Sequence, residues 1–169
     1  MGFRKYIMAA TLLLAFGGTA MAQKNKLTLE LGTHISAYDK EFAPIGLRAD
    51  WGYGITDWLT VGFRLEDVVS LVELDDVKTY DQNATSGLFA RFNVLKFDSN
   101  VLSVKAVGGT SLTNDDWKFV YYDCAVRLER VVKRWNFGCG IGARYYDSRN
   151  DVLGNKFRVY MDIGVGMVL

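Results

Sequence analysis

Apolar and polar residues alternate along most of the chain after residue 22. In the segment 27–36, leucine or isoleucine occupies four of the five odd positions, and the even positions carry Thr28, Glu30, Gly32, His34 and Ser36. A period of two predicts a strand whose two faces meet different surroundings. The same alternation returns in seven later segments: 45–54, 59–66, 87–94, 102–106, 120–129, 136–144 and 157–169. The chain is therefore predicted to be all-β, with eight strands.

The connections between these segments differ in length. Short turns follow the second, fourth and sixth segments, and a long stretch, Asp67–Ser86, follows the third. Short turns at one end and longer loops at the other are typical of antiparallel outer-membrane barrels, whose strands of about 9–11 residues cross the bilayer at a tilt. We interpret Asp67–Ser86 as a surface loop whose apolar run, Val68–Val72, could contact a protein partner. The alternative is that the third and fourth strands extend and pair with each other.

The glycines indicate which face points inward. Of the 14 glycines after residue 22, 12 lie on the polar face, all but Gly108 and Gly154. In a soluble barrel whose polar face is in water, there is no steric reason to place glycine on that face, and glycine weakens strands. The interior of an eight-stranded barrel, in contrast, is only just wide enough for side chains. The sequence therefore predicts a polar interior and a lipid-facing apolar surface, which requires a closed, up-and-down transmembrane barrel.

Aromatic residues gather near the predicted strand ends, as expected where a membrane meets water. The group at the short-turn end contains Trp51, Tyr53, Phe97, Trp135 and Phe137. The group at the opposite end contains Tyr38, Phe42, Trp117, Tyr145 and Phe157. The alternative to two such girdles is that strand-rich chains are rich in aromatic residues anyway.

The first 22 residues have the features of an export signal. Arg4 and Lys5 precede an apolar stretch at 7–16, and Ala20-Met21-Ala22 matches the small-x-small pattern of a cleavage site. We therefore expect a signal peptide at 1–22 and one barrel domain at 23–169, located in a bacterial outer membrane. The formal net charge of +1 gives no indication of a nucleic-acid partner.

These features resemble the small eight-stranded outer-membrane barrel family, which includes the transmembrane domain of outer-membrane protein A. The resemblance covers essentially all of 23–169. It implies contact with outer-membrane lipid and lipopolysaccharide, insertion by the barrel-assembly machinery, and a member without a periplasmic peptidoglycan-binding domain. That machinery reads a C-terminal polar-x-Gly-x-x-aromatic-x-aromatic pattern, whose positions hold Asp162, Gly164, Met167 and Leu169 here. Met167 and Leu169 depart from the aromatic preference.

Charged residues at interior positions are nearly balanced. Buried charges must be paired and hydrogen-bonded to be tolerated, so we predict a salt-bridge network that fills the barrel, with a narrow polar pore as the alternative. The seven basic positions are Arg48, Arg64, Arg91, Lys105, Arg127, Arg144 and Arg158. The six acidic positions are Glu30, Asp50, Glu66, Asp123, Glu129 and Asp162.

Motifs for catalysis and metal binding are sparse. The sequence has no nucleophile elbow, zinc-binding histidine pair, P-loop, C-x-x-C or calcium loop, so we expect no metal and no cofactor. His34 and Ser36 share a face, and this His-x-Ser spacing resembles that of the lipid A deacylases among small barrels. Both residues have interior parity, whereas a lipid substrate approaches from outside. The leading hypothesis is a non-enzymatic barrel with a role in envelope integrity, adhesion or a surface assembly. A lipid A-modifying enzyme is the alternative, and a narrow channel is a third possibility.

Cys124 and Cys139 both fall on the predicted lipid-facing side. If Val131-Val132 forms the turn between their strands, the two cysteines are direct cross-strand neighbours; a one-step shift places Cys139 opposite Val126. The Cβ atoms of direct neighbours lie about 4.5–5.5 Å apart, which is wider than the about 3.5–4.5 Å of a disulfide. We expect two free thiols, with a disulfide as the alternative in an oxidising compartment.

Overall fold

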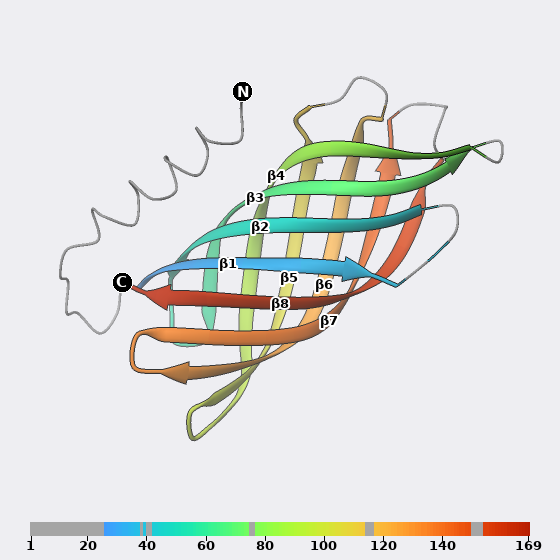
Figure 1. The fold of residues 1–169 in the computed structure, drawn as a ribbon. Helices are drawn as coiled ribbons and strands as arrows, with labels where there is room; N and C mark the ends of the chain where they lie inside the picture. The colour runs from blue at the N-terminus through green and yellow to red at the C-terminus, as the bar shows by residue number, and fades with distance from the viewer. Residues whose placement is uncertain (1–25, 38, 40–41, 75–76, 114–116, 150–153) are drawn as a thin grey trace, which may run out of the picture.

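The chain folds into a closed eight-stranded antiparallel barrel in which each strand pairs with the next and β8 pairs with β1 (Figure 1). The computed structural model describes residues 26–37, 39, 42–74, 77–113, 117–149 and 154–169, those within 72–79 by their backbone alone. The expected signal peptide at 1–22 lies outside these residues. The strands are β1 (Leu27–Ser36), β2 (Phe42–Gly54), β3 (Leu59–Leu74), β4 (Val77–Phe97), β5 (Asn100–Ser111), β6 (Phe119–Val132), β7 (Trp135–Ser148) and β8 (Lys156–Val168). Among the described residues, no helix is long and apolar enough to cross a bilayer.

The alternation in the sequence determines which side chains enter the barrel. In β1, Glu30 and His34 are buried, whereas Leu31 and Ile35 are each 49% exposed. The strand pairs are antiparallel and matched residue by residue, so the two faces continue from strand to strand around the barrel. The predicted all-β, eight-stranded fold is confirmed, and its polar face is the interior.

Glycine makes room for the large interior side chains. A Cβ at Gly46 would overlap the imidazole of His34, and one at Gly62 would overlap the ring of Phe89 and the carbonyl of Trp51. Gly108 and Gly154, which the sequence places off the polar face, have open space around them. The steric reasoning from the sequence therefore holds for most interior glycines; at Gly54, the last residue of β2, an added Cβ would meet only ordinary contacts at 3.7 and 3.9 Å.

Residues 67–74 and 77–86 belong to two paired strands, so the alternative that the third and fourth strands extend and pair is confirmed, and the surface-loop interpretation is wrong. The two strands are paired without interruption from Asp67 with Ala84 to Leu74 with Val77. Alternation continues through this segment, because Ser70 is buried and Leu71 is exposed. We call Asp67–Ala84 the projecting hairpin, since β5 pairs with β4 only from Thr85 onward. On its other side, residues 67–72 of β3 still pair with 42–47 of β2.

The turn between β6 and β7 is Lys133-Arg134, not Val131-Val132. Val132 pairs with Trp135, and Lys133 adopts a left-handed φ of 56°. β-branched valines suit a strand better than a turn, which explains why β6 runs through them.

This register separates the two cysteines. Cys124 pairs with Ala143, and Cys139 pairs with Leu128. The offset of four positions corresponds to about 13 Å along the strand, and both thiols are free and exposed. The sequence-based pairings of Cys139 with Cys124 or with Val126 were therefore both wrong.

Candidate functional site

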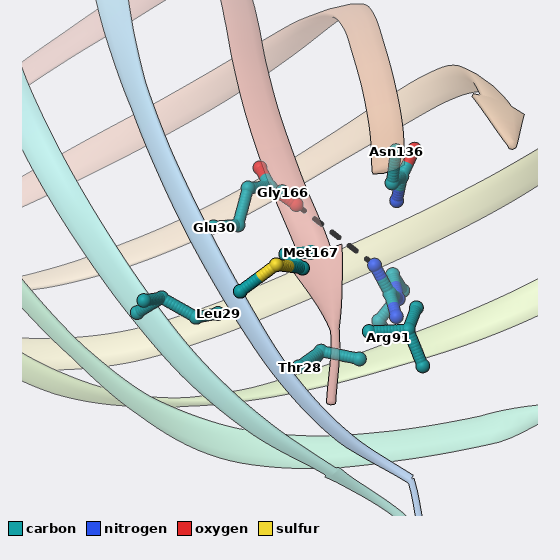
Figure 2. A pocket seen from close by; sticks show the side chains of 8 residues that line it. Thr28, Leu29, Glu30, Arg91, Asn136, Gly166 and Met167 are labelled. Atoms are coloured by element: carbon teal, nitrogen blue, oxygen red, sulfur yellow. Dashed lines mark ion pairs between the residues drawn. The ribbon is translucent and has the colours of Figure 1, made fainter. Parts of the chain in front are cut away.

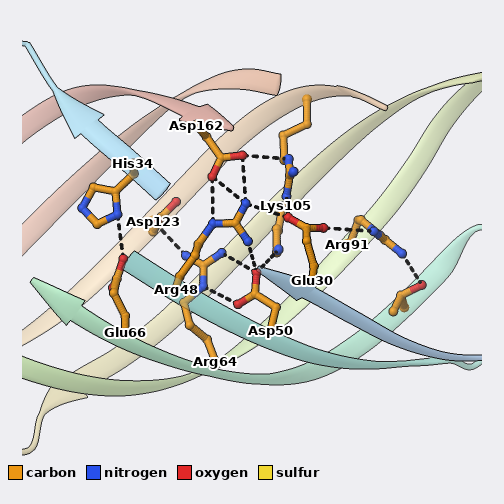
Figure 3. Close-up of polar contacts among 12 residues, drawn as sticks. Glu30, His34, Arg48, Asp50, Arg64, Glu66, Arg91, Lys105, Asp123 and Asp162 are labelled. Atoms are coloured by element: carbon orange, nitrogen blue, oxygen red, sulfur yellow. Dashed lines mark hydrogen bonds and ion pairs between the residues drawn. The ribbon is translucent and has the colours of Figure 1, made fainter. Parts of the chain in front are cut away.

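The interior of the barrel holds the candidate functional site. At the predicted positions lies a set of charged side chains contributed by all eight strands, which we call the charged network; Figure 3 shows a large part of it. Its six basic members are Arg48, Arg64, Arg91, Lys105, Arg127 and Arg144. Its six acidic members are Glu30, Asp50, Glu66, Asp123, Glu129 and Asp162. The members are buried, apart from the 11% exposure of the Arg91 side chain, so their charges compensate one another away from water.

One part of the charged network joins the first and last strands. Arg48 donates from Nε to Asp162 Oδ2 at 2.9 Å and from Nη2 to Glu30 Oε1 at 2.6 Å. Arg127, on β6, donates from Nη1 to the same Glu30 oxygen at 2.7 Å, and its Nε lies 3.0 Å from Asp162 Oδ1. Two arginines thus share two carboxylates across the barrel.

Asp50 is the meeting point of three basic side chains. Arg64 donates from Nε to Asp50 Oδ1 at 2.7 Å, and Lys105 donates from Nζ to Asp50 Oδ2 at 2.5 Å. Arg48 also donates to this carboxylate. The strands β2, β3 and β5 are therefore connected through one acidic group.

A second centre of the charged network forms around Arg144. Its guanidinium donates to Glu66 Oε2 at 2.9 Å and to Asp123 Oδ2 at 2.7 Å. The Nδ1 atom of His34 lies 2.7 Å from Glu66 Oε1, and Tyr160 donates its hydroxyl hydrogen to Asp123. His34 is thus part of the interior packing, 1% exposed, as the sequence predicted.

The end of the interior nearest the short turns is more open. Glu129 accepts hydrogen bonds from Arg91 at 3.2 Å, Ser103 at 3.0 Å and Asn136 at 2.7 Å. Arg91 and Asn136 also line a small hollow beside β1 and β8 (Figure 2). The hollow has room for about one water molecule, which is far too small for a small-molecule ligand.

Arg158 belongs to a different set from the other predicted basic residues. It lies at the opposite end of the barrel, where its Nη2 atom is 3.2 Å from Asp39 Oδ2 and its Nε donates to the carbonyl of Phe42 at 2.8 Å. The sequence listed seven basic but only six acidic interior residues. The additional acidic partner is Asp39, which pairs with Arg158 and lies outside the alternating segments.

A mainly aromatic cluster packs against the charged network inside the barrel and extends toward the end opposite the short turns. We call it the aromatic cluster; its buried members are Val107 and the aromatic residues Phe42, Phe89, Trp117, Phe119, Tyr121 and Tyr146. Ring centroids of Trp117 lie 4.9 Å from Phe42 and 4.5 Å from Phe119. The guanidinium of Arg144 lies 4.5 Å from the centroid of the Tyr121 ring, so the cluster contacts the network directly.

The aromatic cluster corrects part of the predicted girdles. Phe42 and Trp117, expected at the membrane surface, are 0% and 2% exposed inside the barrel. Tyr145 and Phe157 do lie on the outer surface, while Tyr38 is outside the described residues. The alternation along β6 could have identified interior aromatic residues, since Phe119 and Tyr121 lie on the same face of the strand as Asp123. Proximity to a strand end does not identify the face.

The remaining predicted residues have clear positions. Ser36 is 9% exposed on the same interior face as His34, and Ile35 between them points outward. Asp162 and Gly164 of the C-terminal motif face the charged network, where a Cβ at Gly164 would lie 2.6 Å from Glu30 Oε1. Leu169 is 37% exposed. Within the described residues, no group of three or more histidine, cysteine, aspartate or glutamate side chains could hold a metal ion.

One solved structure agrees with this architecture. No family model and no curated protein sequence matches the chain. Among solved structures, it is similar to the N-terminal β-barrel domain of Pseudomonas aeruginosa OprF, with a TM-score of 0.51 and 13% sequence identity over 86% of this chain and 100% of that domain. The de novo designed protein TMB2.3 matches with a TM-score of 0.40 and 11% identity over 87% of this chain and 97% of the design. The chain thus has the fold of the small eight-stranded outer-membrane barrels.

Proposed function

We propose that the chain is a non-enzymatic outer-membrane barrel that carries the projecting hairpin at the cell surface and contributes there to envelope integrity, adhesion or a surface assembly. The observation that carries the proposal is the occupied interior, which contains compensated charges at one level and packed rings at the next. An interior filled in this way supports a barrel that acts through its outer surfaces rather than by conduction.

The projecting hairpin offers such a surface. Short turns face the periplasm in barrels of this kind, so the opposite end, with the hairpin, would face outward. Tyr80 is 73% exposed on the part of β4 that β5 does not cover. Its cross-strand partner Leu71 is 53% exposed, and Val69 is 41% exposed, on the part of β3 that pairs with the end of β2. Exposed apolar groups beyond a membrane mark contact surfaces, which favours a protein or surface partner for this element.

Shortening the hairpin tests the proposal. Val72 and Thr79 are cross-strand partners, and β2 pairs with β3 only as far as Val72, so residues 73–78 can be replaced by an Asn-Gly turn that preserves both pairings. We expect the shortened protein to fractionate with the outer membrane and to keep the altered gel mobility of an unheated barrel. A strain that produces it should lose the adhesion or detergent resistance conferred by the full-length chain.

A point variant separates surface chemistry from length. Leu71→Ser with Tyr80→Ser leaves the backbone pairing intact and removes the apolar surface, so it should reproduce the loss. Identical phenotypes for the shortened and full-length proteins would contradict a role for the hairpin. Solute-dependent swelling of proteoliposomes would support the narrow channel instead.

A further inference from the structure

One side of the barrel surface at the short-turn end combines basic and aromatic side chains. The outward positions of β6 are Val120, Tyr122, Cys124, Val126, Leu128, Arg130 and Val132. Arg130 is the one charged residue among them, and it is exposed. A cation on an otherwise apolar face that meets lipid needs an anionic partner or an interfacial position.

The neighbours of Arg130 are suited to a headgroup region. Across the strands it pairs with Asn100 on one side and Phe137 on the other. Lys133 and Arg134, which form the turn after β6, and Trp135, the first residue of β7, are all exposed. We call the six residues Asn100, Arg130, Lys133, Arg134, Trp135 and Phe137 the basic-aromatic surface.

The cations of this surface lack carboxylate partners. No ion pair joins Arg130, Lys133 or Arg134 to an acidic group among the described residues, and Asp98 is the single acidic residue in the adjacent turns 98–99 and 133–134. At the other end of the barrel, Arg149 lies 3.3 Å from Asp147, and Arg158 lies 3.2 Å from Asp39. Within the described part of the chain, the basic-aromatic surface therefore presents cations without an ion-pair partner, whereas Arg149 and Arg158 at the other end are paired.

We propose that the basic-aromatic surface binds the phosphodiester headgroup of an anionic phospholipid in the inner leaflet of the membrane. The inference rests on the proposed outer-membrane location, which puts the short turns on the periplasmic side. The guanidinium of Arg130 would hold the phosphate through paired hydrogen bonds, with the Asn100 amide as a further donor. Phe137 and Trp135 would pack against the glycerol and upper acyl region, where aromatic side chains are favoured. Lys133 and Arg134 would add attraction from the aqueous side.

Trp135 provides a local probe of the bound lipid. The mature chain is folded into phosphatidylcholine vesicles that contain one-tenth brominated phosphatidylglycerol or, in parallel, one-tenth brominated phosphatidylcholine. Subtracting the emission of a Trp135→Phe variant isolates the quenching of this tryptophan. Each basic side chain near a headgroup raises the local concentration of an anionic lipid about fivefold, so we expect several-fold stronger quenching by phosphatidylglycerol.

Matched variants assign the effect to the surface. Arg130→Gln combined with Lys133→Gln and Arg134→Gln should make the two brominated lipids equivalent. Lys26→Gln removes an exposed cation beside β1 at the same end and should leave the preference unchanged.

The outcomes separate this inference from the proposed function. Equal quenching by both lipids in a barrel with the heat-dependent gel mobility of the inserted state overturns the lipid site and leaves the membrane assignment standing. A preference that survives the triple substitution, or that disappears in Lys26→Gln, overturns the assignment to these residues. A chain that fails to enter either type of vesicle overturns both proposals.

Discussion

Interior glycines and large side chains share a fixed volume, which makes single glycine positions sensitive to one added methyl group. Gly62→Ala places a Cβ against the backbone carbonyl of Trp51 as well as the Phe89 ring, and a backbone atom cannot move away easily. We expect a loss of about 1–3 kcal/mol in the free energy of unfolding, measured by urea titration in detergent micelles. Gly108→Ala, which meets open space, is the matched control and should be neutral or stabilise the barrel by up to about 1 kcal/mol.

Substituting a buried arginine should lower the free energy of unfolding more than substituting an exposed one. Arg144→Met leaves Glu66 and Asp123 without their shared cation, and breaking a buried ion pair costs about 3–5 kcal/mol. Arg149→Gln removes an exposed ion pair with Asp147 and should cost about 0–1 kcal/mol. The same urea titration compares the two. Equal losses would mean that the charged network does not contribute more than a surface pair.

Ser36 tests the enzymatic alternative. It is buried on the interior face, and Ile35 is the residue that points outward between it and His34. We expect Ser36→Ala to leave the acylation pattern of lipid A unchanged when the protein is overproduced in a Gram-negative host. Mass spectrometry that shows an acyl chain removed or added by the wild-type protein, and not by the variant, would establish the enzyme instead.

At the scale of the strands, register decides which residues meet. Cys124 lies opposite Ala143, so Ala143→Cys should form a disulfide with Cys124 on oxidation after local adjustment of the strand pair. Cys139→Ser keeps the native thiol count in this variant. In the wild-type protein, labelling under denaturing, non-reducing conditions should detect two thiols. Detection of none would contradict the observed register.

Elements were predictable from the sequence to different degrees. Alternation located all eight strands because lipid and a packed interior impose opposite chemistry on the two faces. It placed the short turns near residues 56–57 and 98–99, but it did not locate the ends of every strand, since alternation can continue beyond the expected segment, as it does in β3 through Ser70 and Leu71. The turn at Lys133-Arg134 lacks glycine, asparagine and proline, so no residue there signals a reversal.

For the whole molecule, the lipid-facing surface is the feature that a charge should disturb most. Ile163 is 52% exposed in the middle of β8, and Ile163→Arg should destabilise the barrel by up to about 2–4 kcal/mol if the side chain meets the bilayer midplane. Tyr80→Arg is the control and should be near neutral, because Tyr80 is 73% exposed on the part of β4 that β5 does not cover. Unfolding in lipid vesicles measures both, and an unaffected Ile163→Arg would contradict the lipid-facing assignment.

The candidate site was predictable in its composition and not in its connections. Parity identified the interior charges, because each one alternates with an apolar neighbour. It could not show that Arg127 meets Glu30 across the barrel, since that contact depends on strand tilt and closure, which no single strand encodes. For the same reason, the partnership of Arg158 with Asp39 became visible only in three dimensions.

The contacts of Arg48 and Arg127 with both Glu30 and Asp162 have a consequence for assembly. Glu30 and Asp162 stand on β1 and β8, which meet only when the sheet closes. An open intermediate in hydrocarbon would expose free strand edges and unmatched charge at the same time. Edge pairing and charge compensation are thus completed by one event, so insertion should be a single cooperative transition in which hairpins do not enter the bilayer one after another.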